Sequence, residues 1–178
     1  ILHSAAQKGN LAICQAIVGK VDDVDLKDDS GRTPLYFAVS NKYTEIALLL
    51  IEKLKDPNTK NYSEDGDGET VLHIAARNGD LAICQAMIKK LEDNHPQIKE
   101  SNKVNPSNKE GETPLFYATQ RGYTDIIKLI LANTNDANPK LKDGTTPLHV
   151  AARDGRREIC QMIIDKLEKA NPQDEEGN

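Results

Sequence analysis

The chain has 178 residues and a formal net charge of −5, from 28 acidic and 23 basic side chains. This acidic balance disfavours broad electrostatic binding to nucleic acid or to an anionic membrane surface. Only 4% of the residues are aromatic and there is no Trp, so the core must come from Leu, Ile, Val and Ala, which suits closely packed short helices.

Similar segments recur along the chain, and each predicts the start of a helix. In chain order they are residues 2–6, 33–38, 70–76, 113–118 and 146–152. Their shared Leu lies at positions 2, 35, 72, 115 and 148, at intervals of 33, 37, 43 and 33 residues. The two longer intervals are 33 residues with insertions of 4 and 10, in polar stretches near 58–66 and 94–105. A recurring period of this length is typical of a repeat array.

The later segments share the same local signals. A Gly stands two residues before each of Thr33, Thr70, Thr113 and Thr146. Thr can cap a helix N-terminus, and a Pro directly after it suits the first turn, where no amide donor is needed. Leu and Ala then recur at i and i+3, which predicts one apolar helical face.

A turn and a second helix follow each of these short helices. The turn residue is Gly9, Gly79, Gly122 or Gly155, whereas Lys42 takes this place in the second segment. We expect Lys42 to cost about 1 kcal/mol if its backbone is left-handed. The stretches after the turn are apolar over much of their circumference, which predicts helices with several neighbours. Because helices this short are marginal alone, adjacent pairs must bury each other's apolar faces.

The motif Thr-Pro-Leu-His-x-Ala at a 33-residue period resembles the ankyrin repeat, and residues 144–155 (GTTPLHVAARDG) are a near-complete copy. The resemblance covers essentially the whole chain. It implies an all-α repeat solenoid of stacked helix-turn-helix units with β-hairpin loops, whose hairpins and first helices form a concave side. We expect one domain over residues 1–178, with repeats at approximately 1–31, 32–68, 69–111, 112–144 and 145–178.

Alternate repeats are more alike than adjacent ones. Repeats one, three and five share Ile-Cys-Gln in their second helix, and repeats two and four share an aromatic pair after the Leu. We infer that repeats were duplicated in pairs. Because the chain opens inside a repeat, we expect it to be a fragment of a longer array.

Reactive residue types form no convincing chemical site in the sequence. Cys14, Cys84 and Cys160 lie on apolar helix faces, which predicts buried thiols in a reducing, cytoplasmic compartment. His3, His73 and His149 each lie in a separate repeat, so they do not converge as zinc ligands would. The resemblance implies that each ring bonds the Thr at the start of its helix or the neighbouring loop. We therefore expect no enzyme, no cofactor and no metal.

The loops after the second helix carry an Asn that is hydroxylated in some members of the family. Asn105, Asn138 and Asn171 match that position. Each is followed by Pro where the family commonly has Ala, which disfavours recognition by a hydroxylase.

The resemblance predicts a scaffold that binds a protein partner through the concave hairpin and first-helix surface. Basic residues recur before the turn Gly, and acidic residues gather on the hairpin side, which would select partners by charge pattern. The candidate contact residues are Arg32, Ser40, Asn41, Lys42, Glu69, Arg77, Asn78, Glu112, Gln120, Arg121, Thr145, Arg153 and Asp154.

Two other functions remain open. The array could target or tether a larger multidomain enzyme, or be the cytosolic part of a membrane channel. It could also be part of a long elastic stack. In each case we expect a protein partner, no nucleic acid and a monomeric fragment. We also expect no direct membrane insertion, because the longest apolar run covers only residues 46–51.

Overall fold

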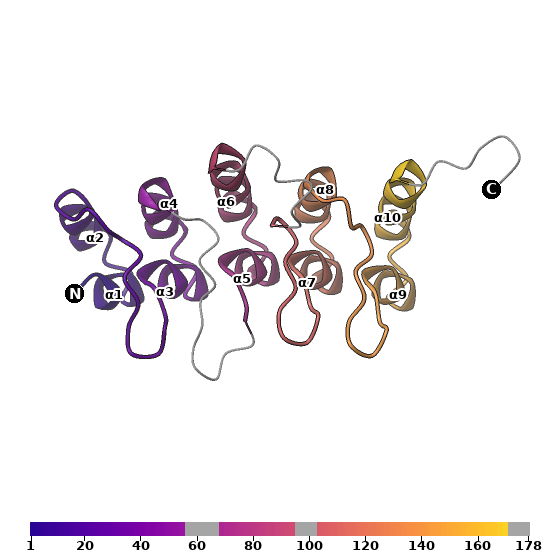
Figure 1. Cartoon of the computed structure of the whole chain (residues 1–178), viewed down its shortest axis with the longest axis horizontal. Helices are drawn as coiled ribbons and strands as arrows, with labels where there is room; N and C mark the ends of the chain where they lie inside the picture. Colours follow the sequence, from indigo (N-terminus) through magenta and orange to yellow (C-terminus); the bar gives the residue numbers. More distant parts are fainter. Residues whose placement is uncertain (56–67, 95–102, 171–178) are drawn as a thin grey trace, which may run out of the picture.

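The computed structural model describes residues 1–55, 68–94 and 103–170, and these residues form two parallel rows of α-helices (Figure 1). One row holds the first helix of each pair: α1 (Leu2–Gln7), α3 (Pro34–Ser40), α5 (Val71–Asn78), α7 (Pro114–Arg121) and α9 (Pro147–Arg153). The other row holds the second helices: α2 (Leu11–Val18), α4 (Thr44–Lys53), α6 (Leu81–Asn94), α8 (Thr124–Asn133) and α10 (Arg157–Ala170). The expected stack of successive helical hairpins is confirmed.

The predicted Thr caps start the first-row helices. Thr33 Oγ1 accepts a hydrogen bond from the Tyr36 amide at 3.1 Å, and Thr113 Oγ1 accepts one from the Phe116 amide at 3.2 Å. A Pro follows both of these Thr residues and also Thr146. Local sequence therefore fixes where these helices begin.

The turns inside the pairs have the left-handed backbone that the sequence predicts. Gly79 and Gly122 both have φ of 79°, and Lys42 occupies the matching position with φ of 61°. Among the described residues, Lys42 is the only non-glycine with a positive φ. The expected strain at Lys42 is therefore present.

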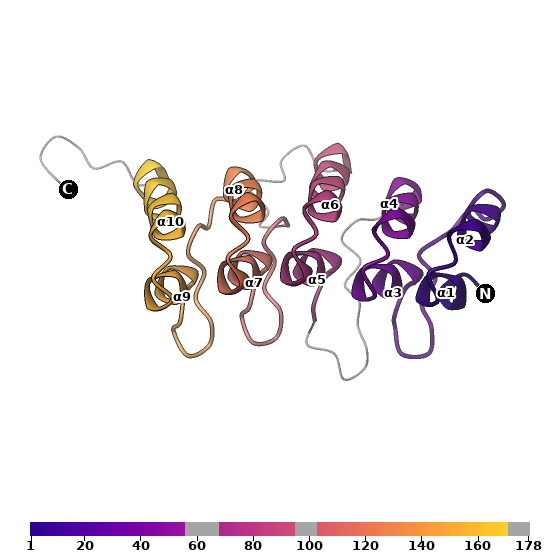
Figure 2. The same ribbon diagram turned by 180° about the vertical axis from the view of Figure 1, so that it is seen from behind.

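The described loops before α3, α7 and α9 project from the first-row helices on the side away from the second row (Figures 1 and 2). The Asp28 amide donates to the Arg32 carbonyl at 2.9 Å, and the Leu141 amide donates to the Thr145 carbonyl at 2.8 Å. These loops are the expected hairpins in reduced form, because within the described ranges none extends into a strand. The loops at 28–32, 108–112 and 141–145 each close over five residues with one such hydrogen bond, which is too short a span for a strand ladder.

The core lies between the two rows and continues from pair to pair. Ala38, Ala75, Ala118 and Ala151 are fully buried in the first row, and Leu50 and Ile130 are fully buried in the second. Small side chains let neighbouring first-row helices approach closely, and the larger aliphatic side chains fill the space behind them. The ends of the first-row helices lie at the surface, where Ser40, Lys42 and Arg153 are exposed.

Candidate interaction surface

The predicted contact residues form two bands at opposite ends of the first-row helices. The start band comprises the residues directly before the capping Thr: Arg32, Glu69, Glu112 and Thr145. The end band comprises the residues at and after the helix end: Ser40, Asn41, Lys42, Arg77, Asn78, Gln120, Arg121, Arg153 and Asp154. Helices of this length span about 10–12 Å, so the two bands are that far apart along the helix axis.

Two asparagines of the end band join neighbouring pairs. Asn78 Nδ2 donates to the Val39 carbonyl at 2.9 Å, and Asn41 Nδ2 donates to the Gln7 carbonyl at 3.4 Å. Each bond satisfies a carbonyl near the C-terminus of the preceding first helix. Asn41 and Asn78 therefore support the stack from within this band.

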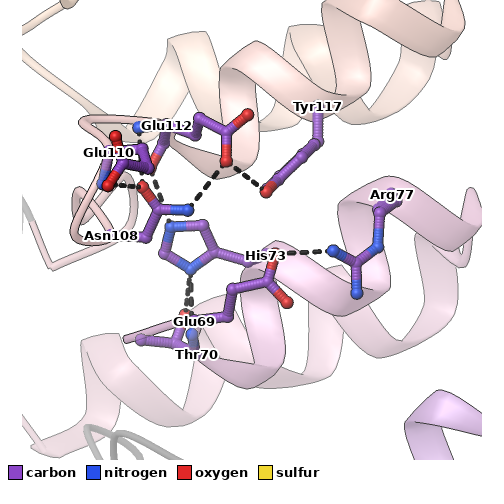
Figure 3. Close-up of polar contacts among 8 residues, drawn as sticks. All are labelled: Glu69, Thr70, His73, Arg77, Asn108, Glu110, Glu112 and Tyr117. Carbon is purple, nitrogen blue, oxygen red and sulfur yellow. Dashed lines mark hydrogen bonds and ion pairs between the residues drawn. The ribbon is translucent and has the colours of Figure 1, made fainter. Parts of the chain in front are cut away.

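Acidic partners lie beside several arginines of both bands. Arg77 Nη1 lies 2.6 Å from Glu69 Oε1, and its guanidinium lies 5.3 Å from the centre of the Tyr117 ring (Figure 3). Arg32 Nη2 lies 3.0 Å from Asp28 Oδ2. Burial acts to raise the pKa of Asp28, but hydrogen bonds from Arg32 and Ser30 lower it overall. Arg32 and Arg77 are thus held in place and partly neutralised.

Glu112 organises the loop before α7. Its Oε2 accepts hydrogen bonds from the Tyr117 hydroxyl at 2.6 Å and from Asn108 Nδ2 at 2.9 Å (Figure 3). Asn108 Oδ1 in turn accepts from the Glu112 amide at 2.8 Å. Burial raises the pKa of Tyr117, and the nearby Glu112 and Glu69 raise it further, so the hydroxyl remains a donor. Tyr117 and Asn108 complete this network, although their role was not predicted.

His73 joins the third pair to the fourth, in agreement with its predicted structural role. Its Nδ1 accepts a hydrogen bond from the Thr70 amide at 3.0 Å, which leaves Nε2 as the donor to the Glu112 carbonyl, 3.1 Å away (Figure 3). Burial lowers the pKa of His73 to about 4, so the ring is neutral. His3 makes the corresponding contact to the Arg32 carbonyl at 3.1 Å.

The remaining reactive residue types are also used for packing or capping. Cys14 and Cys84 are buried as expected, and burial raises the pKa of Cys84 to about 12. Asn105 and Asn138 accept hydrogen bonds from the Leu115 and Leu148 amides at 2.9 and 3.0 Å, whereas Asn171 lies outside the described residues. In the described ranges no three His, Cys, Asp or Glu side chains gather where they could hold a metal ion.

Arg156 is a surface residue whose contacts the sequence did not predict. Its guanidinium donates to the Thr119 and Gln120 carbonyls near the end of α7, the second at 3.0 Å. It also lies 3.4 Å from Asp154 Oδ2, and Arg153 Nε lies 3.3 Å from Asp154 Oδ1. The sequence could have pointed to Arg156 through its position, because Arg156 aligns with Tyr43 and Tyr123 of the even repeats.

Comparison with known proteins gives one consistent family. The family described as ankyrin repeats (three copies) matches residues 2–99, 58–143 and 94–175. The chain is 32% identical over 124 residues to alpha-latrotoxin-Lg1a of Latrodectus geometricus, a match that covers 68% of this chain and 8% of the toxin.

Two further relatives are a channel and a proteasome subunit. The human transient receptor potential cation channel subfamily A member 1 is 29% identical over 132 residues, covering 73% of this chain and 10% of the channel. The probable 26S proteasome regulatory subunit p28 of Saccharomyces cerevisiae is 29% identical over 133 residues, covering 74% of this chain and 54% of the subunit.

Across the described residues, no helix has the length and apolar character needed to cross a bilayer. The family match extends from the first helix pair to the last, in agreement with the stacked architecture and with the motif in each repeat. The chain therefore belongs to the ankyrin-repeat family, whose members are generally non-enzymatic protein-interaction modules.

Proposed function

We propose that this array binds a protein partner across the start and end bands of its first-row helices. The observation that carries the proposal is the contrast between a repeated backbone and varied side chains. In each of the four later pairs a Thr directly precedes the first helix. The start-band position before that Thr is occupied by Arg32, Glu69, Glu112 and Thr145. The start-band side chains are half-buried, and a fixed frame that presents such groups at regular intervals suits recognition of another protein.

The hydrogen bonds inside the bands support this proposal because they orient the side chains before a partner binds. Glu69, Arg77 and Tyr117 hold one another, and Glu112 is fixed by Tyr117 and Asn108. Side chains already held in one geometry lose less conformational entropy on binding. The cytoplasmic location predicted from the free cysteines belongs to the same proposal.

A charge-reversal pair tests which surface binds. Arg121 and Arg153 are exposed in the end band, so Arg121→Glu with Arg153→Glu should abolish capture of partners by photo-crosslinking. The control is Lys53→Glu with Lys89→Glu, which makes the same change in net charge on exposed second-row positions. Capture that survives the first pair, or that both pairs abolish equally, would contradict the proposal.

A second proposal is that the array targets or tethers a larger protein. It is supported by the small share of the toxin and of the channel that the chain covers, 8% and 10%. The intact reading frame tests it directly. Finding an enzymatic or membrane domain beside these repeats would support the second proposal, and finding only further repeats would count against it.

A further inference from the structure

Two grooves occupy the same place in the stack, at the turns between the helices of adjacent pairs. The first lies between the first and second pairs, beside Gly9, Tyr43 and Thr44, with a volume of about 240 Å³. The second lies between the fourth and fifth pairs, with a volume of about 440 Å³. We call the second one the arginine groove, defined by Arg121, Gly122, Arg156 and Arg157.

The two grooves differ in the side chains at matching positions. Tyr43 and Thr44 of the first groove correspond to Arg156 and Arg157 of the arginine groove. The Tyr43 ring lies within 2.6 Å of where a Cβ on Gly9 would be, so an aromatic ring covers that turn. In the arginine groove a guanidinium takes the place of the ring, and the space is larger.

The charge of the arginine groove is only partly balanced. Arg156 is anchored by the two carbonyls of α7 and by Asp154. Arg121 and Arg157 are exposed, and within the described part of the chain neither side chain forms a hydrogen bond or an ion pair. Glu158 also lines the groove, but its Oε1 lies 3.4 Å from Lys128 Nζ. A positive site thus lies on a chain whose net charge is −5.

We propose that the arginine groove binds an acidic segment of a partner protein through its Asp and Glu carboxylates. Guanidinium groups form paired hydrogen bonds with carboxylates, and an anchored guanidinium loses little freedom when it does so. The arginines come from two places, the end of α7 and the turn that enters α10. Arginines spread in this way suit a peptide with several carboxylates better than one small anion. The inference rests on the proposed protein-binding function but extends it past the end band, because the groove shares only Arg121 with that band and adds Arg156 and Arg157.

The test uses the whole chain and short labelled peptides. Fluorescence anisotropy measures binding of fluorescein-labelled hexaglutamate and hexaglutamine to the wild type and to Arg157→Glu and Arg153→Glu. These two variants make the same change in net charge at exposed positions four residues apart, and only Arg157 lines the groove. Hexaglutamate should bind and hexaglutamine should not. Arg157→Glu should weaken binding about tenfold and Arg153→Glu less than about twofold, with tighter binding at low salt.

Each other result would overturn the inference. Failure of hexaglutamate to bind the wild type removes the site. Equal losses in both variants indicate general attraction, and a loss confined to Arg153→Glu assigns the peptide to the end band, which leaves the proposed function standing. Displacement of the peptide by inorganic phosphate at constant ionic strength shows a site for small anions instead. Circular dichroism confirms that both variants are folded.

Discussion

His73 uses both of its ring nitrogens to hold two repeats together, and its burial has a consequence for stability. The folded ring has a pKa of about 4, against an ordinary value of about 6.5. Between these values the unfolded chain takes up a proton that the folded chain does not. The stability from the neutral ring is therefore fully present above pH 6.5 and is lost as the pH falls toward 4.

We predict that the wild type loses about 3 kcal/mol of unfolding free energy between pH 7 and pH 4 through His73 alone. The measurement is urea unfolding of the wild type and of His73→Gln at both pH values. The difference between the two proteins removes the contribution of the carboxyl groups that they share. An equal pH dependence in both proteins would show that His73 titrates normally in the folded state.

Lys42 carries backbone strain that its neighbours do not. Its φ is 61°, whereas Asn41 beside it has φ of −92°. We predict that Lys42→Gly raises the unfolding free energy by about 1 kcal/mol, because glycine adopts the left-handed region without a Cβ clash. Asn41→Gly, measured in the same urea titration, should bring no gain. A gain of the same size at Asn41 would show that the strain is not local.

At the level of elements, the glycine turns of the first, third and fourth pairs each pack against a side chain of the next pair. Tyr43 lies over Gly9 and Tyr123 over Gly79, with ring atoms 2.6 Å from where a Cβ would be. The residue that corresponds to these tyrosines beside Lys42 is the shorter Asp80, whose Oδ2 accepts a hydrogen bond from the Thr44 hydroxyl at 2.5 Å. The sequence thus has a short residue, Asp80, at the position from which Tyr43 and Tyr123 reach their glycine turns, in agreement with a lysine in the second turn.

This matching predicts different costs for the same substitution in two turns. Gly155→Ala should cost about 1 kcal/mol, since its φ is 68° and a Cβ there meets nothing within 4 Å. Gly79→Ala should cost about 1–3 kcal/mol more, because the new Cβ must displace the Tyr123 ring. Thermal unfolding measures both costs. Adding Tyr123→Ala should bring the two costs together, and a persistent difference would count against the steric explanation.

Local chemistry made the helix starts and turns predictable, but contacts between distant residues could not be predicted. Thr113 followed by Pro114 indicates a helix start from two adjacent residues. In contrast, the Glu69–Arg77 ion pair depends on long side chains that meet across eight positions, and Arg156 reaches α7 only because adjacent pairs are placed side by side. The sequence motif also implied β-hairpins, but the loops that the structure describes close without forming strands.

At the level of the whole molecule, the array is a line of units in which each pair contacts the pair before and after it. Ile130 in α8 and Ile163 in α10 are both fully buried. However, α8 lies between α6 and α10, whereas α10 contacts α8 on one side only. A defect should therefore spread in proportion to the number of neighbours.

Hydrogen exchange of two cavity variants tests this behaviour. Each of Ile130→Ala and Ile163→Ala should cost about 2–5 kcal/mol locally. We predict faster amide exchange on both sides of α8 for Ile130→Ala, and faster exchange only in α8, α9 and α10 for Ile163→Ala. Uniformly faster exchange over the whole chain in both variants would mean that the array unfolds as one cooperative block.

The contacts between tyrosine rings and glycine turns also limit how repeats of this array can be exchanged. The Gly9 and Gly79 turns each pack against a tyrosine of the next pair, whereas the pair after the Lys42 turn has Asp80 at that position. Moving a single unit breaks the contact between its turn and the ring of the next unit, whereas moving two consecutive units together keeps the contact between them. We therefore expect a tandem of two repeats to be the smallest part that can be exchanged with one such contact intact.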